Sequence, residues 1–348
     1  MRNLKILAVF HKSTHHSGYS GYAQFLNYIK NIKRIFPTPI LMYFLAKKIA
    51  KKIGKGLGNY DSNSFYKDLQ IIINILKNRK DNLVVHYLNG ERDIRLALSF
   101  FAKKKNVKFI ATFHKPPTIL GELVINKKYL KKLDGAIVVG INQLDFIKKE
   151  LGIKKGLYIP HGVDTTFFKP NYKLRPQNTK IILFVGQHLR DFDIFNNTIE
   201  LLLNENKEHY IVNVILRKEY QHKIIKNSKV NIYSGVSDID LRKHYQAAHV
   251  LFIPFKEVTA CNSILEGLAC GCPIVTTKVG GNSEYLKNTM NILVPQFSDF
   301  NIYKEAIKIL IAQDNDFKIS KSSRMKSNDY EWREIAREVN SFYKSFYS

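Results

Sequence analysis

Cysteines, acidic residues and long apolar runs are all scarce in this chain of 348 residues. The three cysteines lie close together, at positions 261, 270 and 272. A set that is both odd and clustered forms no disulfide framework, and it is typical of a reducing compartment. A zinc site would need a second pair of Cys or His at ligand spacing beside Cys270 and Cys272, and the sequence offers none. We therefore expect neither a disulfide-stapled secreted domain nor a metal centre.

The lack of a long apolar run argues against a membrane-spanning helix, because such a helix needs roughly 20 apolar residues. The N-terminus, Met1–Phe10, holds a short apolar run that stops before His11 and Lys12 and has no small-residue cleavage site. It therefore predicts a buried strand rather than a signal peptide. We expect a soluble or peripheral protein that stays in the cytoplasm, at the inner face of the membrane if it is peripheral.

Acidic residues are scarcest in the first half of the chain, where none precedes Asp61. The chain holds 55 Lys and Arg against 29 Asp and Glu, a formal net charge of +26. Residues 1–170 hold 31 basic and 10 acidic residues, or +21, whereas the remainder holds 24 and 19, or +5. This asymmetry predicts an anionic partner surface for the N-terminal half. Specific nucleic-acid recognition is not expected, because no zinc-finger spacing, aromatic RNA-binding signature or basic region with heptads occurs.

Residues 40–57 combine positive charge with a helical apolar repeat. The apolar side chains that recur every four residues are Leu45, Ile49, Ile53 and Leu57, and the lysines of the other side are Lys47, Lys48, Lys51, Lys52 and Lys55. This pattern is typical of a basic amphipathic helix that lies in an anionic membrane interface. The alternative is an ordinary surface helix that covers the core of its own domain.

Short β-branched and aromatic runs alternate with helical patterns along the whole chain. In the first half we expect strands at Lys5–Phe10, Leu83–Tyr87, Lys108–Thr112, Gly135–Val139 and Leu157–Ile159, and helices at Tyr22–Ile35, Phe65–Lys77, Asp93–Lys104 and Gln143–Leu151. In the second half we expect strands at Ile181–Val185, Tyr210–Leu216, Val230–Tyr233, Val250–Ile253, Ile274–Thr277 and Asn291–Val294.

Strand–helix alternation predicts parallel sheets covered by helices. Residues 168–178 hold two prolines and little apolar pattern, so they are interpreted as a linker. The sequence therefore predicts an α/β protein of two Rossmann-like domains that face each other across a cleft, with residues 1–170 in the first and 171–328 in the second. Ligands of such sheets bind at the carboxyl ends of the strands.

The stretch from Phe255 to Glu284 carries the most specific pattern. It predicts a loop with Glu257, a helix at Asn262–Ala269, a stop at Gly271 and a strand opened by Pro273. The helix start, formed by Ala260, Cys261, Asn262 and Ser263, would present free amides and a positive dipole to a phosphate. Glu257 and Glu266 could accept hydrogen bonds from sugar hydroxyls, which suits a nucleotide-sugar. The alternative is a plain capped helix in which Glu266 is solvated.

This stretch resembles the donor-binding signature of retaining glycosyltransferases of the GT-B fold, family 4, also described as glycosyl transferases group 1. The matching residues are Leu265-Glu266, Gly271, Pro273-Ile274-Val275 and Gly280-Gly281-Asn282-Ser283-Glu284. The resemblance implies that Glu266 holds the donor ribose and that Glu257 contacts the sugar as a catalytic residue. Val258 occupies the usual position of the first acid, so the two acids lie nine rather than eight positions apart.

Other segments extend the resemblance over nearly the whole chain. It implies that Gly186 and Arg190 bind the donor diphosphate, that Val236 lines the donor site and that His114 touches the donor sugar. Gly18 and Gly21 match the glycine loop after the first strand, and residues 159–164 match an interdomain motif in which His161 replaces Asn. The alternative for Gly21 and His161 is an ordinary turn. Residues 329–348 are expected to form a helix that crosses back to the first domain.

Three Asp-x-Asp strings, at 191–193, 238–240 and 314–316, could hold a metal on a diphosphate, but short strings arise often by chance. Asp238 and Asp240 are better explained as a helix start. We expect no metal or other cofactor, since Arg190 and the helix dipole can stabilise the leaving diphosphate.

The resulting hypothesis is retaining transfer from a UDP- or GDP-sugar to a glycan or lipid-linked acceptor, in cell-envelope polysaccharide or glycolipid synthesis. The alternatives are a nucleotide-sugar epimerase of similar fold and a non-catalytic basic protein that binds membranes or nucleic acid.

Overall fold

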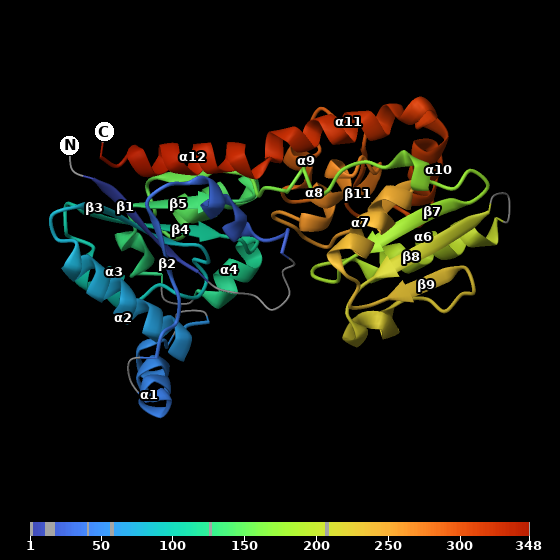
Figure 1. Ribbon diagram of the computed structural model, residues 1–348. Helices are drawn as coiled ribbons and strands as arrows, with labels where there is room; N and C mark the ends of the chain where they lie inside the picture. Colours follow the sequence, from blue (N-terminus) through green and yellow to red (C-terminus); the bar gives the residue numbers. More distant parts are fainter. Residues whose placement is uncertain are drawn as a thin grey trace. The chain divides into compact units, whose positions relative to one another are not determined.

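The computed structural model describes residues 3–10, 18–39, 42–55, 59–124, 127–205 and 209–347. The chain forms two compact units, each built on a parallel six-stranded sheet with helices packed against it (Figure 1). The first unit comprises Met1–His16, Tyr22–Pro160 and Arg333–Ser348, and the second comprises Ser17–Gly21 and His161–Trp332. The units therefore meet in the chain at residue 160, where the sequence suggested residue 170, and residues 168–178 lie inside the second unit rather than between the units.

The first unit has the strand order β2-β1-β3-β4-β5-β6, and the neighbouring strands are parallel. Its strands are β1 (Leu4–Val9), β2 (Ile32–Ile35), β3 (Asn82–Tyr87), β4 (Val107–Phe113), β5 (Gly135–Val138) and β6 (Gly156–Tyr158). Its helices are α1 (Tyr43–Ile53), α2 (Ser62–Lys77), α3 (Leu96–Phe101), α4 (Pro117–Leu123), α5 (Leu144–Lys149) and, apart from its first residue, α12 (Trp332–Lys344). Helices on such a sheet bury its faces, and the strands are correspondingly apolar.

The second unit has the order β12-β11-β10-β7-β8-β9, again with parallel neighbours. Its strands are β7 (Lys180–Val185), β8 (Tyr210–Ile215), β9 (Val230–Tyr233), β10 (Val250–Ile253), β11 (Ile274–Lys278) and β12 (Ile292–Pro295). Its helices are α6 (Phe192–Asn204), α7 (Asp238–Ala247), α8 (Asn262–Ala269), α9 (Asn282–Tyr285), α10 (Phe300–Gln313) and α11 (Lys318–Ser327). In chain order this is the doubly wound pattern 3-2-1-4-5-6, so the strand order reverses between β7 and β10.

Both sheets confirm the predicted α/β fold, and all eleven predicted strands are present within two residues of their expected bounds. The predicted helix Tyr22–Ile35 is wrong. A 3-10 helix at Tyr22–Tyr28 is followed by Asn31 with a φ of 61° and then by the edge strand β2. On this edge strand Lys33 and Arg34 are exposed and Ile35 is buried, so the isoleucines recur every three residues as they would on a helix.

The predicted helix Asp93–Lys104 is shorter in the structure because α3 starts only at Leu96. The Asp93 carboxylate is buried and pairs with the Lys67 ammonium at 2.8 Å. The first N–H groups of α3, those of Leu96 and Ala97, donate to the carboxylate of Asp68 on α2 at 2.8 and 3.0 Å. The cap of α3 thus comes from another helix, and local sequence carries no sign of it.

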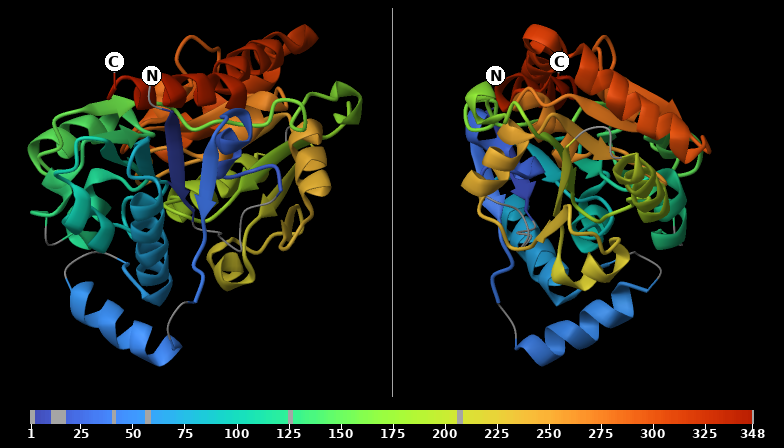
Figure 2. Two further views of the ribbon diagram at one scale, coloured as in Figure 1. Left: turned by 60° about the vertical axis from the view of Figure 1, so that its left-hand side comes forward. Right: turned by 90° about the vertical axis from the view of Figure 1, so that its right-hand side faces the viewer.

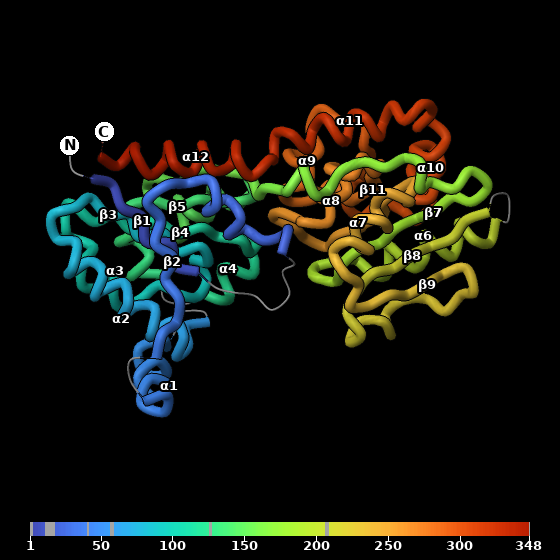
Figure 3. Tube along the Cα trace, viewed as in Figure 1, coloured from blue at the N-terminus to red at the C-terminus, as the bar shows by residue number. Residues whose placement is uncertain are grey.

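The C-terminal helix α12 belongs, from Arg333 onward, to the first unit and runs along its sheet (Figure 3). The Tyr343 hydroxyl lies 2.6 Å from Nδ1 of the buried His86 on β3. Burial lowers the pKa of His86 to about 3, so this imidazole is neutral at ordinary pH. Farther along, the Tyr347 hydroxyl donates to the carbonyl oxygen of Leu83, at the start of β3, at 2.6 Å. Two tyrosines therefore fasten the C-terminal segment to both ends of one strand.

Helix α1 confirms the predicted helix over its described residues, whereas Leu57 lies outside the described residues. The turned views of Figure 2 show α1 beside α2 at one end of the first unit. Ala46 and Ala50 are buried, and Ile49 and Ile53 pack against the core of that unit. In the described ranges of the chain, no helix is long and apolar enough to cross a membrane.

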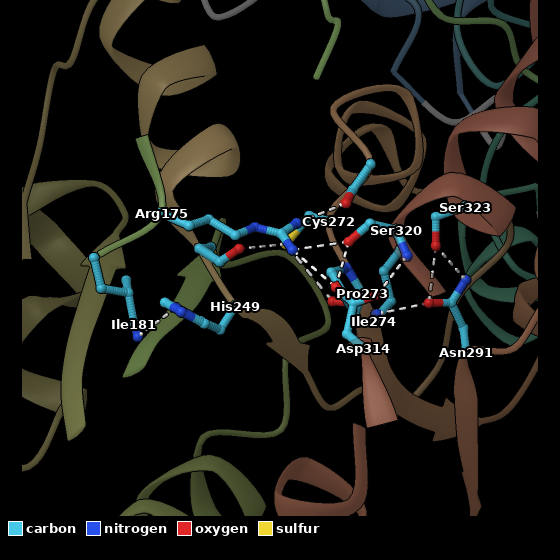
Figure 4. A network of polar contacts seen from close by, with 12 residues as sticks. Arg175, Ile181, His249, Cys272, Pro273, Ile274, Asn291, Asp314, Ser320 and Ser323 are labelled. Carbon is cyan, nitrogen blue, oxygen red and sulfur yellow. Dashed lines mark hydrogen bonds and ion pairs between the residues drawn. The ribbon is translucent and has the colours of Figure 1, made fainter. Parts of the chain in front are cut away.

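A buried polar cluster lies at the amino ends of β7 and β11 in the second unit (Figure 4). The Arg175 guanidinium donates to Asp314 at 2.8 Å and to the carbonyl oxygen of Gly271 at 2.8 Å. Burial, with a smaller contribution from Arg175, lowers the pKa of His249 to about 4, and Nδ1 of His249 accepts from the Ile181 N–H. Since ligands of such sheets bind at the carboxyl ends of the strands, this cluster has a structural role.

Candidate functional site

Two loops come together where the strand order of the second sheet reverses. One follows β7 and spans residues 186–191, and the other follows β10 and spans residues 254–261. The Lys256 N–H donates to the carbonyl oxygen of Leu189, and the Asp191 N–H donates to that of Pro254, both at 3.0 Å. The fold therefore builds one rigid platform at the position where doubly wound sheets bind their ligands.

Arg190 lies at the centre of this platform and is buried. Its Nε and Nη2 atoms donate to the carbonyl oxygen of Val185, at 3.1 and 2.8 Å, and Nη1 donates to that of His188 at 3.2 Å. The guanidinium carbon stands 4.3 Å from the centre of the Phe255 ring, a cation–π arrangement. Arg190 thus fixes both loops as well as placing a positive charge between them.

The same guanidinium reaches the start of helix α8. Its Nη2 atom lies 3.4 Å from Cys261 Sγ and 3.3 Å from Ser263 Oγ. Gly186, with a φ of 88°, leaves room for it, because a Cβ there would stand 2.8 Å from Arg190 Nη2. The structure thus brings together four of the predicted donor-site residues. Amides of the first helical turn and a buried guanidinium meet here, which is an environment suited to an anion.

Glu266 lies one turn inside α8 and is buried. Its Oε1 accepts from the Ser20 hydroxyl at 2.6 Å, and its Oε2 accepts from the Tyr245 hydroxyl at 2.9 Å. Burial raises the pKa of Glu266 to about 7, although both hydrogen bonds act in the opposite direction. Each carboxylate oxygen has a second lone pair, so the group can accept two further hydroxyls.

The glycine pair of the motif supports the loop that carries Glu257. The Gly281 N–H donates to the carbonyl oxygen of Val258 at 3.1 Å. Gly280 has a φ of 53°, and a Cβ at this position would overlap that same carbonyl oxygen. Only glycine permits this approach, since other residues rarely adopt positive φ and would clash. Glu257 itself is half-buried at the turn of the loop, and it has a partner.

Ala260 and Asn262 are half-buried beside the helix start, and Val236 packs against the same apolar core. The glycine loop groups with this second unit. In it, Gly21 has a φ of 109°, which favours glycine, and Tyr19 stacks on Phe167 with ring centres 3.6 Å apart.

The interdomain motif packs against the start of α12. The His161 ring stands edge-on to Trp332 at 5.1 Å, and a Cβ on Gly162 would overlap that indole. The His161 N–H donates to the Tyr285 hydroxyl at 2.7 Å. This close packing explains the need for glycine next to His161 and gives the motif a structural role within the second unit.

The first Asp of each Asp-x-Asp string has a local partner or position. Asp191 accepts from the Ile194 N–H as the cap of α6, and Asp238 opens α7 as predicted. Asp314 pairs with Arg175 in the cluster of Figure 4, at 2.8 Å.

His114 belongs to the first unit, directly after β4. Its Nε2 donates to the carbonyl oxygen of Leu88 at 2.8 Å, since a carbonyl can only accept. The ring stands edge-on to Tyr22 with centres 4.9 Å apart. When the imidazole is neutral, the proton on Nε2 makes Nδ1 an acceptor.

Several residues of these sites were not predicted from the sequence. Tyr245 and Ser20 bond to Glu266, and Tyr22 packs on His114. None lies inside a recognisable motif, and each reaches its partner only through the fold.

Comparison with known proteins agrees with this arrangement. Residues 179–313, which include β7, β10, α8 and their loops, match the sequence model of the family described as glycosyl transferases group 1. The chain belongs to the glycosyl transferases group 1 family. The matched stretch contains both loops of the platform.

One relative of this group 1 chain is a phosphatidylinositol N-acetylglucosaminyltransferase subunit from Arabidopsis thaliana, 24 % identical over 80 % of this chain. The chain spans 65 % of the length of that relative.

Two solved structures resemble the group 1 chain over nearly its whole length. Sucrose-phosphate synthase from Thermosynechococcus elongatus has a TM-score of 0.70 and 14 % identity, with 99 % of each chain covered. The Anabaena protein HepE, solved with UDP and glucose, has a TM-score of 0.65 and 12 % identity, with 99 % of this chain and all of the other covered. At this identity the likeness shows the fold, which is GT-B.

Proposed function

We propose that this chain transfers a sugar from a nucleotide-sugar donor to a glycan or lipid-linked acceptor, with retention of configuration as in family 4. The observation that carries the proposal is the meeting of the α8 start, the Arg190 guanidinium and the Glu266 carboxylate on one platform. A nucleoside diphosphate offers charges for the first two and ribose hydroxyls for the third.

The chemistry follows from how charge develops during the transfer. The bond between the sugar and the diphosphate breaks, positive charge grows on the sugar and negative charge grows on the departing diphosphate. Donors held in place at that diphosphate stabilise the transition state, typically by about 10²–10³ in rate each. Arg190 and the α8 amides would act in this way without a metal. Glu257, on the loop braced by Gly280 and Gly281, is the candidate for the sugar contact.

His114 would complete the sugar site from the first unit. With its Nε2 proton held by Leu88, neutral His114 can accept a sugar hydroxyl through Nδ1 but cannot donate to it. We expect this contact to be lost when the imidazole is protonated. The donor base is proposed as uracil or guanine, and the UDP bound by the Anabaena protein favours uracil.

We also propose that α1 binds an anionic membrane surface, which would bring a lipid-linked acceptor within reach. At its start Met42, Tyr43 and Phe44 are 77 %, 63 % and 78 % exposed. Lys47, Lys48, Lys51 and Lys52 follow them and are exposed as well. Because Ile49 and Ile53 pack on the core, the membrane contact shifts from the apolar stripe to residues 42–45. Aromatic rings at the headgroup level and lysines beside anionic lipid are a recurrent combination, at about 1 kcal/mol per lysine.

Vesicle flotation tests this membrane contact. The wild-type protein should float with vesicles that contain phosphatidylglycerol and stay behind with pure phosphatidylcholine. The double variant Tyr43→Ser, Phe44→Ser and the double variant Lys47→Glu, Lys51→Glu should each float less. A control with the same change of charge, Lys103→Glu with Lys105→Glu, should float like the wild type. Equal loss in the control would reduce the effect to net charge.

Incubation with a panel of UDP- and GDP-sugars tests the transfer itself. A transferase releases nucleoside diphosphate, and the release rises when a lipid-linked or glycan acceptor is added. An epimerase would instead interconvert the sugar of the donor without releasing diphosphate. A non-catalytic binding protein would do neither with any donor. Cell-envelope polysaccharide or glycolipid synthesis is the context we propose, since the named function of the Arabidopsis relative concerns a phosphatidylinositol acceptor.

A further inference from the structure

Two buried side chains outside the recognised motifs hold the backbone on either side of His114. Oε1 of Glu91 accepts from the N–H groups of His114 and Lys115, at 2.5 and 2.8 Å. Nε2 of Gln143 donates to the carbonyl oxygens of Phe113 and Lys115, at 3.0 and 2.8 Å. The donors and acceptors of this three-residue loop are therefore held from two other loops at once.

Gln143 also fixes its own loop. Its Oε1 accepts from the N–H groups of Val139 and Gly140, at 3.1 and 2.9 Å. One carboxamide thus makes four hydrogen bonds that join the residues after β4 to those after β5. Gln143 is 0 % exposed and Glu91 is 3 % exposed, so water does not compete for these bonds. Buried and fully bonded amides of this kind hold a backbone rigidly.

We propose that Glu91 and Gln143 are positioning residues that hold His114 where the donor sugar binds. The inference rests on the proposed function, which makes His114 a sugar contact. Loops are ordinarily the mobile part of a domain, so a side chain on a loop that must meet a sugar needs such support. Misplacement of a contact by about 1 Å can reduce a rate about 10²-fold.

A purely structural role would show itself differently. If Gln143 only stabilised the fold, its loss would lower the melting temperature and leave the surviving folded protein fully active. The second unit supplies a matched control in Gln246, which is 6 % exposed and donates to the carbonyl oxygen of Lys169 at 2.7 Å. Deleting either carboxamide removes a buried glutamine, but only one of them touches the His114 loop.

The experiment compares Gln143→Met with Gln246→Met and Glu91→Met with Glu91→Gln in the full chain. The readouts are kcat and KM for the donor and the ring nitrogen resonances of His114 in protein labelled with ¹⁵N-histidine, assigned with His114→Gln. We expect Gln143→Met and Glu91→Met to lower kcat/KM about tenfold or more. Glu91→Gln retains an acceptor for both amides and should keep most of the activity.

The His114 resonances should move in Gln143→Met, as the ring leaves the Leu88 carbonyl, and should stay in place in Gln246→Met. Equal kinetic losses in the two glutamine variants, or unchanged His114 resonances in Gln143→Met, would overturn the inference. If the wild-type protein releases no diphosphate from any donor, the proposed function fails, but the resonances still report whether the two residues hold the ring.

Discussion

The pKa of Glu266 leads to a prediction that ties donor binding to stability. Folding raises this pKa from 4.5 to about 7, mainly because burial disfavours the carboxylate. Below pH 4.5 the group is protonated in the folded and unfolded chain alike, and it has no effect on stability. As the pH rises from 4.5 to about 7, the folded chain holds more protons than the unfolded one, so its stability falls. Above about pH 7 the loss is complete.

The size of this loss follows from the pKa difference. At about 1.4 kcal/mol for each pH unit between the two pKa values, the buried carboxylate destabilises the second unit by about 3 kcal/mol at pH 8. Glu266→Gln removes the ionisation. Its amide can still accept from Tyr245 and can donate to Ser20, so most of the local packing is kept. We therefore expect the variant to be more stable than the wild type at pH 8, by up to about 3 kcal/mol, and equally stable near pH 4.5.

Hydrogen exchange of peptides from α8 and β10 measures this locally, without assuming that two units unfold in one step. The difference in opening free energy between Glu266→Gln and the wild type should grow with pH between 5 and 8. Meanwhile the variant should bind UDP- or GDP-sugars more weakly, because an amide cannot accept both ribose hydroxyls. Wild-type donor affinity should itself decline below about pH 7, as the carboxylate becomes protonated. A stability difference that is constant over this pH range would refute the reasoning.

Three further variants test other parts of the two units. Arg190→Ala should lower kcat about 10²–10³-fold, and Arg190→Lys should retain part of the rate, because lysine keeps the charge but not the fork of donors; steady-state kinetics with matched donor titrations would reveal an unchanged enzyme if the assignment is mistaken. Gly280→Ala should destabilise the second unit by about 1–3 kcal/mol and reduce activity, since a methyl group there overlaps a carbonyl oxygen, whereas the helical Gly121→Ala should be tolerated in the same thermal scan. Tyr343→Phe leaves a buried imidazole nitrogen without its hydroxyl and should destabilise the first unit by about 1–3 kcal/mol, against about 1 kcal/mol for Tyr347→Phe. Similar hydrogen-exchange losses for the two tyrosine variants would contradict that difference.

Patterns confined to a few consecutive residues predicted the local structure well. Helix α8 has the bounds that the sequence suggested, and Gly271 ends it with a φ of 67°. The alternation of short apolar runs and helical repeats gave the strands of both sheets. By contrast, β2 was missed because an edge strand with Lys33 and Arg34 exposed has the apolar spacing of a helix. The membrane-like stripe of α1 was partly misread, because Ile49 and Ile53 are satisfied by the core of their own unit.

The roles of single side chains were harder to predict, because they depend on partners far away in the sequence. Arg190 was expected as a diphosphate ligand, yet its donors are largely taken by the carbonyl oxygens of Val185 and His188. Its charge can still act on a diphosphate over several ångströms, whereas direct bidentate binding would need those bonds to break. The same long-range pairing hid Glu91 and Gln143, each more than 20 residues from the loop it holds.

The doubly wound topology explains why the motif after β10 was nevertheless sufficient to locate the donor site. In the order β12-β11-β10-β7-β8-β9, the loops after β7 and β10 leave the sheet side by side in opposite directions, so a gap for a ligand opens between them whatever their sequences. A helix start placed after β10 must then face the loop after β7. Arg190 and Gly186 lie on that second loop, and they meet Cys261 and Ser263 as a consequence of strand order alone. The chemistry of the site is written in separate motifs, and the sheet supplies their adjacency.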